Sequence, residues 1–273
     1  MADPEITSPK SARVVEVRRL HDRRHRAERG AFVVEGPPSV QAALGHGILE
    51  IYVTADAADR HAGIVEAARE SGARVSRCTP AAIEAMSQTQ QPQGIVAVCP
   101  LVTVDLARAL GRIGATPSAC VVILDRVGDP GNAGTVIRTA DAMGAAAVIL
   151  TEGSVDPHNG KCVRATAGSL FHVAIASDVA VADALDAVRT SGLLLVAADA
   201  RGSLALGTLG ARTVLEGPVA WVFGNEAHGV HEDLARAAHE TVAIPQYGGA
   251  ESLNMAAAAA ICLYETARSQ HER

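Results

Sequence analysis

Several features are scarce in this chain of 273 residues, and each scarcity excludes a class of protein. The longest unbroken apolar run covers only residues 255–264, which is too short to cross a bilayer. Charged residues make up only 20% of the chain, and together with a mean hydropathy of +0.17 this excludes general disorder. The chain is therefore expected to fold around one large or two modest cores and to have no membrane partner.

Cysteines are few and scattered, so the sequence contains no disulfide framework. The five of them include no CxxC pair, and an odd total cannot pair completely. The N-terminus also lacks the charged-then-apolar pattern of a secretory signal. We therefore expect reduced core thiols and a cytoplasmic location.

Basic charge is concentrated at the N-terminus. The formal net charge of −6 argues by itself against a nucleic-acid partner. Residues 1–30, however, contain eight basic and five acidic residues, so this segment has a formal net charge of +3 and the remaining 243 residues have a formal net charge of −9. Residues 11–29 are predicted to form one helix in which apolar positions alternate with arginine. This helix is either a solvated surface helix or an arm that contacts phosphate groups.

The order of apolar segments predicts an α/β protein with two domains. Strands alternate with helices over residues 31–100, which indicates a small α/β domain behind a basic extension at 1–30. Residues 101–118 form a linker with one short helix. In residues 119–273 the strands are continuous apolar runs, the pattern expected of a parallel sheet covered on both faces.

Three strands of the larger domain end in turns rich in glycine, asparagine and proline. The turns follow residues 121–127, 219–224 and 241–245. Ligands bind beyond the carboxyl ends of strands in an open parallel sheet, so one composite pocket is predicted. No turn has the lysine of a Walker A loop or a GxGxxG pattern, which argues against nucleotide-phosphate and nicotinamide sites. The polar residues at 226–232 are better explained as a helix cap than as metal ligands, so no metal is predicted.

Polar residues occur in these turns in three arrangements. They are Asn132-x-Gly134-x-x-x-Arg138-Thr139, then Phe223-Gly224-Asn225-Glu226-x-x-Gly229, and then Ile244-Pro245 followed by Glu251-Ser252-Leu253-Asn254-Met255-Ala256. In order and context they resemble the three motifs of the SpoU (TrmH-like) branch of the SPOUT RNA methyltransferases. Residues 32–37 and 91–97 are similar to the small L30e-like RNA-binding domain that precedes the catalytic domain in many members. Ala167 stands where the thiostrepton-resistance methylases have a second arginine, which favours a general SpoU methylase.

The resemblance implies both the fold and the methyl donor of the larger domain. The implied fold is a parallel sheet with a trefoil knot, and the implied donor is S-adenosylmethionine, with no metal. Gly224 would let the donor approach the backbone closely. Family members are homodimers, and the small-residue face at 256–260 would either permit close helix approach or pack internally. The residues implied to bind the donor are Ala198, Gly224, Ile244 and Leu253.

The implied reaction is methylation of a ribose 2′-hydroxyl, with ribosomal (23S) RNA as the expected substrate. A tRNA methylase of the same family and a non-catalytic RNA-binding protein of the same fold are the alternatives. Arg138 would contact the hydroxyl and its phosphate, either as a base or, because a guanidinium is rarely deprotonated, by stabilising the developing alkoxide. The residues implied for catalysis are Arg138, Asn132, Glu226, Ser252 and Asn254.

Recognition of RNA is expected to rest on shape and phosphate contacts. The chain has only three Phe, three Tyr and one Trp, which leaves little capacity for stacking on splayed bases. Deletion of residues 1–29 is expected to weaken RNA binding. Ser252, taken by itself, is expected to cap a helix over residues 252–268. The residues expected to contact RNA are Arg13, Arg18, Arg19 and Arg164.

Overall fold

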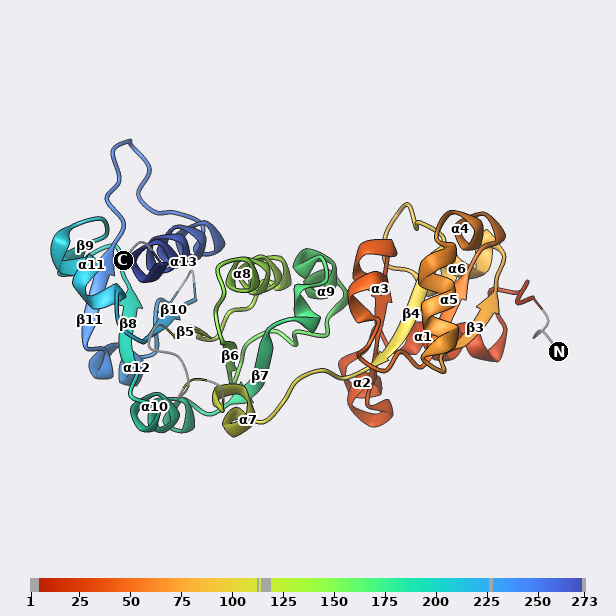
Figure 1. Cartoon of the computed structure of the whole chain (residues 1–273), viewed down its shortest axis with the longest axis horizontal. Helices are drawn as coiled ribbons and strands as arrows, with labels where there is room; N and C mark the ends of the chain where they lie inside the picture. Colours follow the sequence, from red (N-terminus) through yellow and green to blue (C-terminus); the bar gives the residue numbers. More distant parts are fainter. Residues whose placement is uncertain (1–4, 112, 114–118, 226–227, 272–273) are drawn as a thin grey trace. The chain divides into compact units, whose positions relative to one another are not determined.

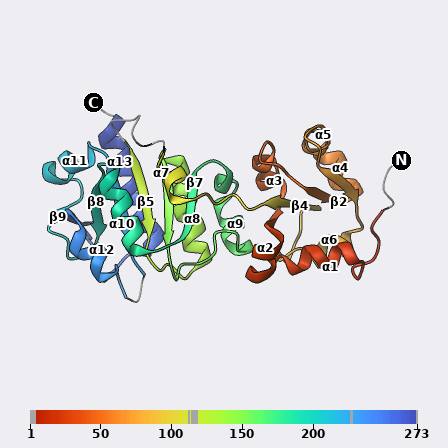
Figure 2. The ribbon, with the colours of Figure 1, turned by 90° about the horizontal axis from the view of Figure 1, so that it is seen from below.

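The chain divides into two compact units. The computed structural model describes residues 5–111, 113, 119–225 and 228–271. The first unit comprises Met1–Val102 and His158–His172, and the second comprises Thr103–Pro157 and Val173–Arg273. Figures 1 and 2 show the helices and strands of each unit from two directions. None of the described helices is both long enough and apolar enough to cross a membrane.

The first unit is a four-stranded sheet covered by short helices. Its elements are α1 (Ala12–Arg19), α2 (Arg23–Arg29), β1 (Ala31–Glu35), α3 (Pro37–Ala43), β2 (Glu50–Val53), α4 (Ala55–Arg60), α5 (Ala62–Glu70), β3 (Arg74–Arg77), α6 (Pro80–Met86), β4 (Ile95–Pro100), α9 (Gly160–Thr166) and the 3-10 turn η2 (Ser169–Phe171). The strand order is β1-β4-β2-β3. Strand β4 is antiparallel to β1 and β2, whereas β2 and β3 are parallel. The α/β fold predicted for this part of the chain from its alternating strands and helices is therefore confirmed.

The basic N-terminal segment forms two helices that belong to the first unit. Asp22 accepts hydrogen bonds from two backbone amides in the first turn of α2, at 2.9 and 3.2 Å, and thereby starts a new helix. The prediction of one helix over residues 11–29 is therefore wrong. On the inner side of α1, Val14, Val17 and Leu20 are buried in the same apolar core as the side chains of α6. The segment is part of the domain core, and only its outer face is available to other molecules.

The second unit contains a seven-stranded parallel sheet. Its elements are α7 (Leu106–Leu110), β5 (Cys120–Leu124), α8 (Pro130–Ala142), β6 (Ala147–Thr151), β7 (Ala174–Val179), α10 (Val181–Thr190), β8 (Leu194–Ala198), β9 (Leu204–Ala205), α11 (Leu209–Leu215), β10 (Val219–Phe223), α12 (Glu232–Ala237), β11 (Glu240–Ala243) and α13 (Met255–His271). The strand order is β7-β6-β5-β10-β8-β11-β9, and every neighbouring pair is parallel. The predicted parallel sheet is thus confirmed.

Helices cover both faces of this sheet. Figure 1 shows α8 and α13 on one side and α7, α10 and α12 on the other. Alternate residues of β5 face opposite layers, and Val121 and Ile123 share a buried cluster with Ala184 of α10 and Leu234 of α12. On the side of α13, the indole Nε1 of Trp221 donates a hydrogen bond to the hydroxyl of Thr266, at 2.9 Å. Burial of both faces explains why the strands are apolar along their whole length.

Three short elements of these units, α4, β9 and α11, were not expected from the sequence, and they contain between two and seven residues each. Segments this short do not complete the two helical turns or the alternation that would make a periodic pattern visible. Both helices begin at a threonine cap: the Thr54 side chain accepts from the Ala57 amide, and the Thr208 side chain accepts from the Ala211 amide. The helix cap expected at 226–232 is present, because His231 caps α12.

Candidate active site

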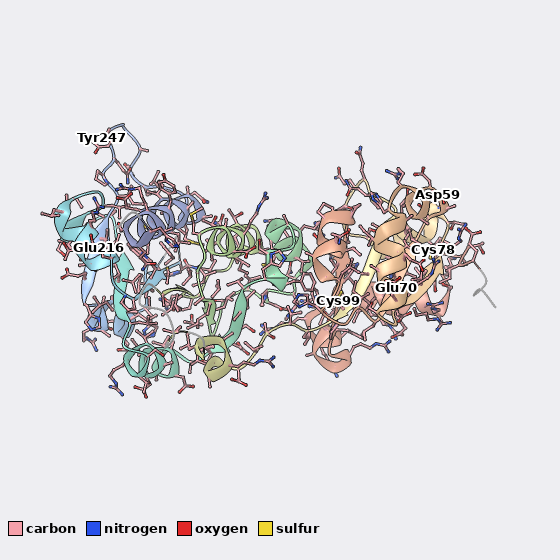
Figure 3. All side chains as sticks on the ribbon, in the orientation of Figure 1. Asp59, Glu70, Cys78, Cys99, Glu216 and Tyr247 are labelled. Carbon is pink, nitrogen blue, oxygen red and sulfur yellow. The ribbon has the colours of Figure 1, made fainter. Side chains whose placement is uncertain are left out.

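A cavity of about 550 Å³ lies at the carboxyl ends of β8, β10 and β11, beside the start of α13. Parallel strands bring these ends to one edge of the sheet, as the turns in the sequence indicated. The cavity is lined by all four residues that were predicted to bind the donor, which are Ala198, Gly224, Ile244 and Leu253. Ser252 and Asn254 line it as well. The loop between β11 and α13 also carries Tyr247, which is 97% exposed and lies at its outer end (Figure 3).

The first motif forms the start of α8. Asp129 caps this helix by accepting a hydrogen bond from the backbone amide of Asn132, at 2.8 Å, and Pro130 occupies the first helical position. Asn132 is half-buried, whereas Arg138 lies six residues further along the helix with an exposed side chain. The helix therefore offers an amide near the sheet edge and a cation on its outer surface.

The third motif is joined to the first by side chains. The Nδ2 group of Asn254 donates to Oδ1 of Asn132, at 3.2 Å. The Oδ1 atom of Asn254 accepts from the backbone amides of Ala256 and Ala257, at 2.9 and 3.3 Å. Asn254 is thus the cap of α13, and the prediction that Ser252 begins this helix is wrong by two to three residues. One asparagine of the third motif therefore both caps α13 and contacts the first motif.

The second motif is a tight loop after β10. The backbone groups of Asn225 and Gly229 bond to each other twice, at 3.0 and 2.7 Å. A Cβ atom on Gly224 would lie 2.3 Å from the carbonyl carbon of Gly229, so the fold of the loop itself requires glycine here. The predicted catalytic residue Glu226 lies outside the described residues.

A smaller cavity of about 80 Å³ adjoins the large one and shares part of its wall. The shared residues are Gly224, Asn225 and Met255, and the rest of its lining includes Asp129 and Asn132. The side-chain amides of Asn132 and Asn254 therefore lie where the two cavities adjoin. The larger cavity has the volume of a small-molecule site, and the smaller one could hold only a small chemical group.

The four arginines predicted to contact RNA differ in exposure. Arg18 and Arg19 are exposed on α1, and Arg19 forms an ion pair with Glu16 at 2.7 Å. Arg13 is turned inward: its guanidinium lies 3.0 Å from the Glu50 carboxylate, 2.8 Å from the Ser76 hydroxyl and over the ring of Tyr52. An inward, paired guanidinium is less available to phosphate than an exposed one.

Arg164 also forms an ion pair within the first unit. Its guanidinium lies 3.2 Å from the carboxylate of Glu35 at the end of β1. The same carboxylate accepts hydrogen bonds from the Gln88 amide, at 3.0 Å, and from the Thr89 hydroxyl, at 3.2 Å. Through Glu35, Arg164 therefore helps to hold the loop that contains Gln88 and Thr89.

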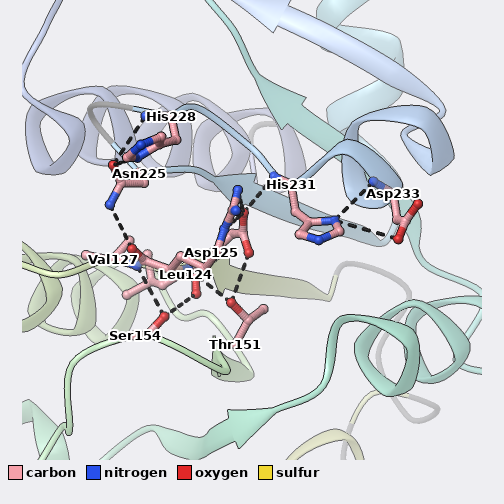
Figure 4. Close-up of polar contacts among 10 residues, drawn as sticks. Leu124, Asp125, Val127, Thr151, Ser154, Asn225, His228, His231 and Asp233 are labelled. Atoms are coloured by element: carbon pink, nitrogen blue, oxygen red, sulfur yellow. Dashed lines mark hydrogen bonds and ion pairs between the residues drawn. The ribbon is translucent and has the colours of Figure 1, made fainter.

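A buried carboxylate near the cavity was missed by sequence reasoning. Asp125 follows the last residue of β5 and is fully buried, and Figure 4 shows its contacts to Thr151 and to the backbone of His231. The sequence signal that could have identified it is the position of an acidic residue directly after the apolar run Val121–Leu124, at the carboxyl end of a buried strand. Among the residues that the structure describes, no group of three or more His, Cys, Asp or Glu side chains could bind a metal ion.

Comparison with known proteins gives a family match for each part of the chain. Residues 119–264 match the SpoU rRNA Methylase family, and residues 11–97 match an MRM3-like substrate binding domain. The second match includes α1, in agreement with the burial of that helix in the first unit.

Individual relatives extend over nearly the whole chain. The 23S rRNA (guanosine(2553)-2′-O)-methyltransferase of Bacillus subtilis is 32% identical, covering 95% of this chain and 98% of that protein. The structure of an AdoMet-bound rRNA methyltransferase from Sinorhizobium meliloti has a TM-score of 0.84 at 33% identity and covers 97% of both chains. AviRb from Streptomyces viridochromogenes, solved with AdoMet, has a TM-score of 0.82 at 27% identity, covering 96% of this chain and all of that one.

Proposed function

Because this chain belongs to the SpoU rRNA methylase family, we propose that it transfers a methyl group from S-adenosylmethionine to a ribose 2′-hydroxyl of 23S ribosomal RNA. One observation carries the proposal: the four predicted donor-binding residues line one cavity, next to the bonded pair Asn132 and Asn254. A non-catalytic protein of the same fold would have no need to keep this polar pair beside an open cavity.

The large cavity fits the proposed methyl donor. Its volume of about 550 Å³ lies within the usual range for small-molecule sites. Phe223, Ile244 and Leu253 offer apolar surface, and Asn225 and Ser252 offer polar groups. When bound, S-adenosylmethionine supplies an electrophilic methyl group on a sulfonium.

The chain's own residues would position and activate the acceptor. Asn132 and Asn254 would orient the ribose hydroxyl by hydrogen bonds, and Ser252 would contribute a further hydroxyl at the cavity wall. The exposed guanidinium of Arg138 would bind the adjacent phosphate and stabilise the negative charge that develops on the hydroxyl oxygen. Glu226 would support the second motif. A role of Arg138 as a base is disfavoured because a guanidinium is rarely deprotonated in proteins.

The test of this assignment is an Arg138→Lys variant, which keeps the charge but removes the planar fork. We expect turnover to fall by about a hundredfold or more while S-adenosylmethionine binding, measured by calorimetry, stays unchanged. Arg189→Lys is the matched control, because Arg189 is an exposed arginine of the same unit outside the cavity lining. Wild-type turnover in the Arg138 variant would exclude the assignment.

The substrate is tested with labelled methyl donor and separate pools of unmodified rRNA and tRNA. Incorporation into 23S RNA, followed by mapping of the methylated ribose, is the expected result. Incorporation only into tRNA would favour a tRNA methylase of the same family, and no incorporation into either pool would favour an RNA-binding protein without activity.

The proposal includes a homodimer in the cytoplasm. Ala256 and Ala259 of the predicted small-residue face are buried within the unit, whereas Ile261 and Tyr264 of α13 are 41% and 59% exposed. We therefore assign the dimer contact to the exposed side of α13. Replacement of both Ile261 and Tyr264 by aspartate should give a monomer in sedimentation equilibrium, and an unchanged dimer would refute this assignment.

A further inference from the structure

The buried carboxylate of Asp125 joins two loops at the edge of the parallel sheet. Its Oδ1 atom accepts a hydrogen bond from the Thr151 hydroxyl, at 2.9 Å, and its Oδ2 atom accepts from the backbone amide of His231, at 2.7 Å (Figure 4). Thr151 ends β6 and is 1% exposed. Hydrogen bonds to a buried carboxylate are short and strong, so these contacts fix the chain at His231.

The next residue anchors the other end of the same loop. Arg126 has a left-handed backbone, with φ of +51°, which is unusual for a residue other than glycine. In this conformation its amide donates to the Thr151 hydroxyl, at 3.0 Å, and its carbonyl accepts from Nδ2 of Asn225, at 2.9 Å. Asp125 and Arg126 thus bind the second-motif loop near both of its ends, and the Thr151 hydroxyl contacts both residues.

The loop between these two anchors forms part of the wall of the large cavity. Gly224, Asn225, Gly229 and Val230 all line that cavity. Any displacement of Asn225, Gly229 or Val230 therefore changes the shape of the cavity. The side chains of Asp125 and Thr151 are not part of the cavity lining.

We propose that Asp125 is a positioning residue for the methyl donor: with Thr151, it holds the second-motif loop in the conformation that binds S-adenosylmethionine. This inference rests on the proposed function, since it assumes that the donor occupies the large cavity. The carboxylate acts on the loop through hydrogen bonds and does not touch the donor. The energetic basis is the cost of leaving a buried charged acceptor without its donor, which would favour rearrangement of the loop.

The test compares Thr151→Val with Thr151→Ser in the full-length protein. Valine keeps the shape but removes the hydroxyl, and serine keeps the hydroxyl. For the valine variant we expect about a tenfold rise in the KM and Kd for S-adenosylmethionine, with the KM for RNA unchanged. Serine should restore donor binding. Hydrogen exchange in the peptide covering residues 224–231 should rise only in the valine variant.

Thr266→Val is the matched control for a merely structural effect. It removes a buried threonine hydroxyl of the same unit that bonds to Trp221 and does not line the cavity. We expect a comparable loss of thermal stability with donor affinity unchanged. Asp125→Asn removes the charge and leaves one acceptor oxygen for two donors, the Thr151 hydroxyl and the His231 amide, so it should weaken donor binding in the same direction as Thr151→Val.

Two different failures can be distinguished. Ala258 lines the large cavity on α13, so Ala258→Leu should block donor binding directly. If Ala258→Leu blocks binding but Thr151→Val binds the donor as tightly as wild type, the positioning role is refuted and the proposed site remains. If Ala258→Leu binds the donor normally, the proposed site itself is refuted. An equal loss of donor affinity in Thr151→Val and Thr266→Val would also refute the positioning role.

Discussion

Removal of residues 1–29 is predicted to unfold the first unit, and not only to weaken RNA binding. The deleted segment includes Val14, Val17 and Leu20, which are 0%, 3% and 5% exposed in the core shared with α6. Burial of each such side chain contributes about 1.5–3 kcal/mol, so the three together contribute roughly 5–9 kcal/mol. That sum is comparable to the whole free energy of unfolding of a domain, about 5–15 kcal/mol.

The two units can be followed separately because Trp221 is the sole tryptophan and lies in the second unit. Its fluorescence reports unfolding of that unit, whereas far-UV circular dichroism reports the helices of both. In the truncated chain we expect the tryptophan transition to remain and the helical signal of the first unit to be lost. A truncated chain that retains its full residual helicity and melts at the wild-type temperatures would show that α1 is a detachable arm and would refute the argument.

Three further predictions concern the outer face of α1, the buried thiols and the half-buried His21. Replacement of both Arg18 and Arg19 by glutamate should leave the unfolding midpoint within the range of ordinary surface variants, but weaken RNA binding and flatten its salt dependence; an unchanged affinity would contradict a phosphate role. Burial raises the pKa of the Cys120 and Cys262 thiols to about 12, so both should react with a disulfide reagent at pH 8 only after unfolding, and rapid labelling of the native protein would contradict this. Burial lowers the pKa of His21, so the unfolded chain binds a proton near pH 6.5 that the folded unit does not. Stability of the first unit should therefore be complete above about pH 6.5 and fall as the pH drops below it; a His21→Gln variant with the same pH dependence as wild type would refute this cause.

The strands and the position of the site could be predicted because both depend on local signals. Continuous apolar runs such as Val121–Leu124 indicate strands buried on both faces, and parallel strands necessarily end at one edge. The turns that follow them therefore had to meet at that edge, and the four residues expected to bind the donor do line one cavity. The trefoil knot stays a prediction, because it is a property of the chain's path that no local pattern encodes.

Other features depended on contacts that a sequence does not display. The break between α1 and α2 follows from one side chain, Asp22, whose capping role competes with its place inside a helical pattern. Gly224 was singled out because a ligand was expected to approach its backbone closely, and the structure adds a requirement that the sequence does not display: the backbone of Gly229 leaves no space for a Cβ atom. Asp125 was missed because its partners come from β6 and from the segment before α12, far away in the chain.

The arrangement of the first and third motifs bears on how the hydroxyl is activated. Asn132 and Asn254 are 122 positions apart, yet their side chains bond at 3.2 Å beside the cavities, so the acceptor can be oriented by amides that carry no charge. Arg138 is on the exposed surface of α8 and lines neither cavity, so its proposed role depends on the RNA that would bind there. Binding of an RNA phosphate there would bring a second charge to the site and exclude water from both. In the proposed mechanism the cation would therefore gain most of its effect in the RNA complex, which favours stabilisation of the developing alkoxide over proton removal.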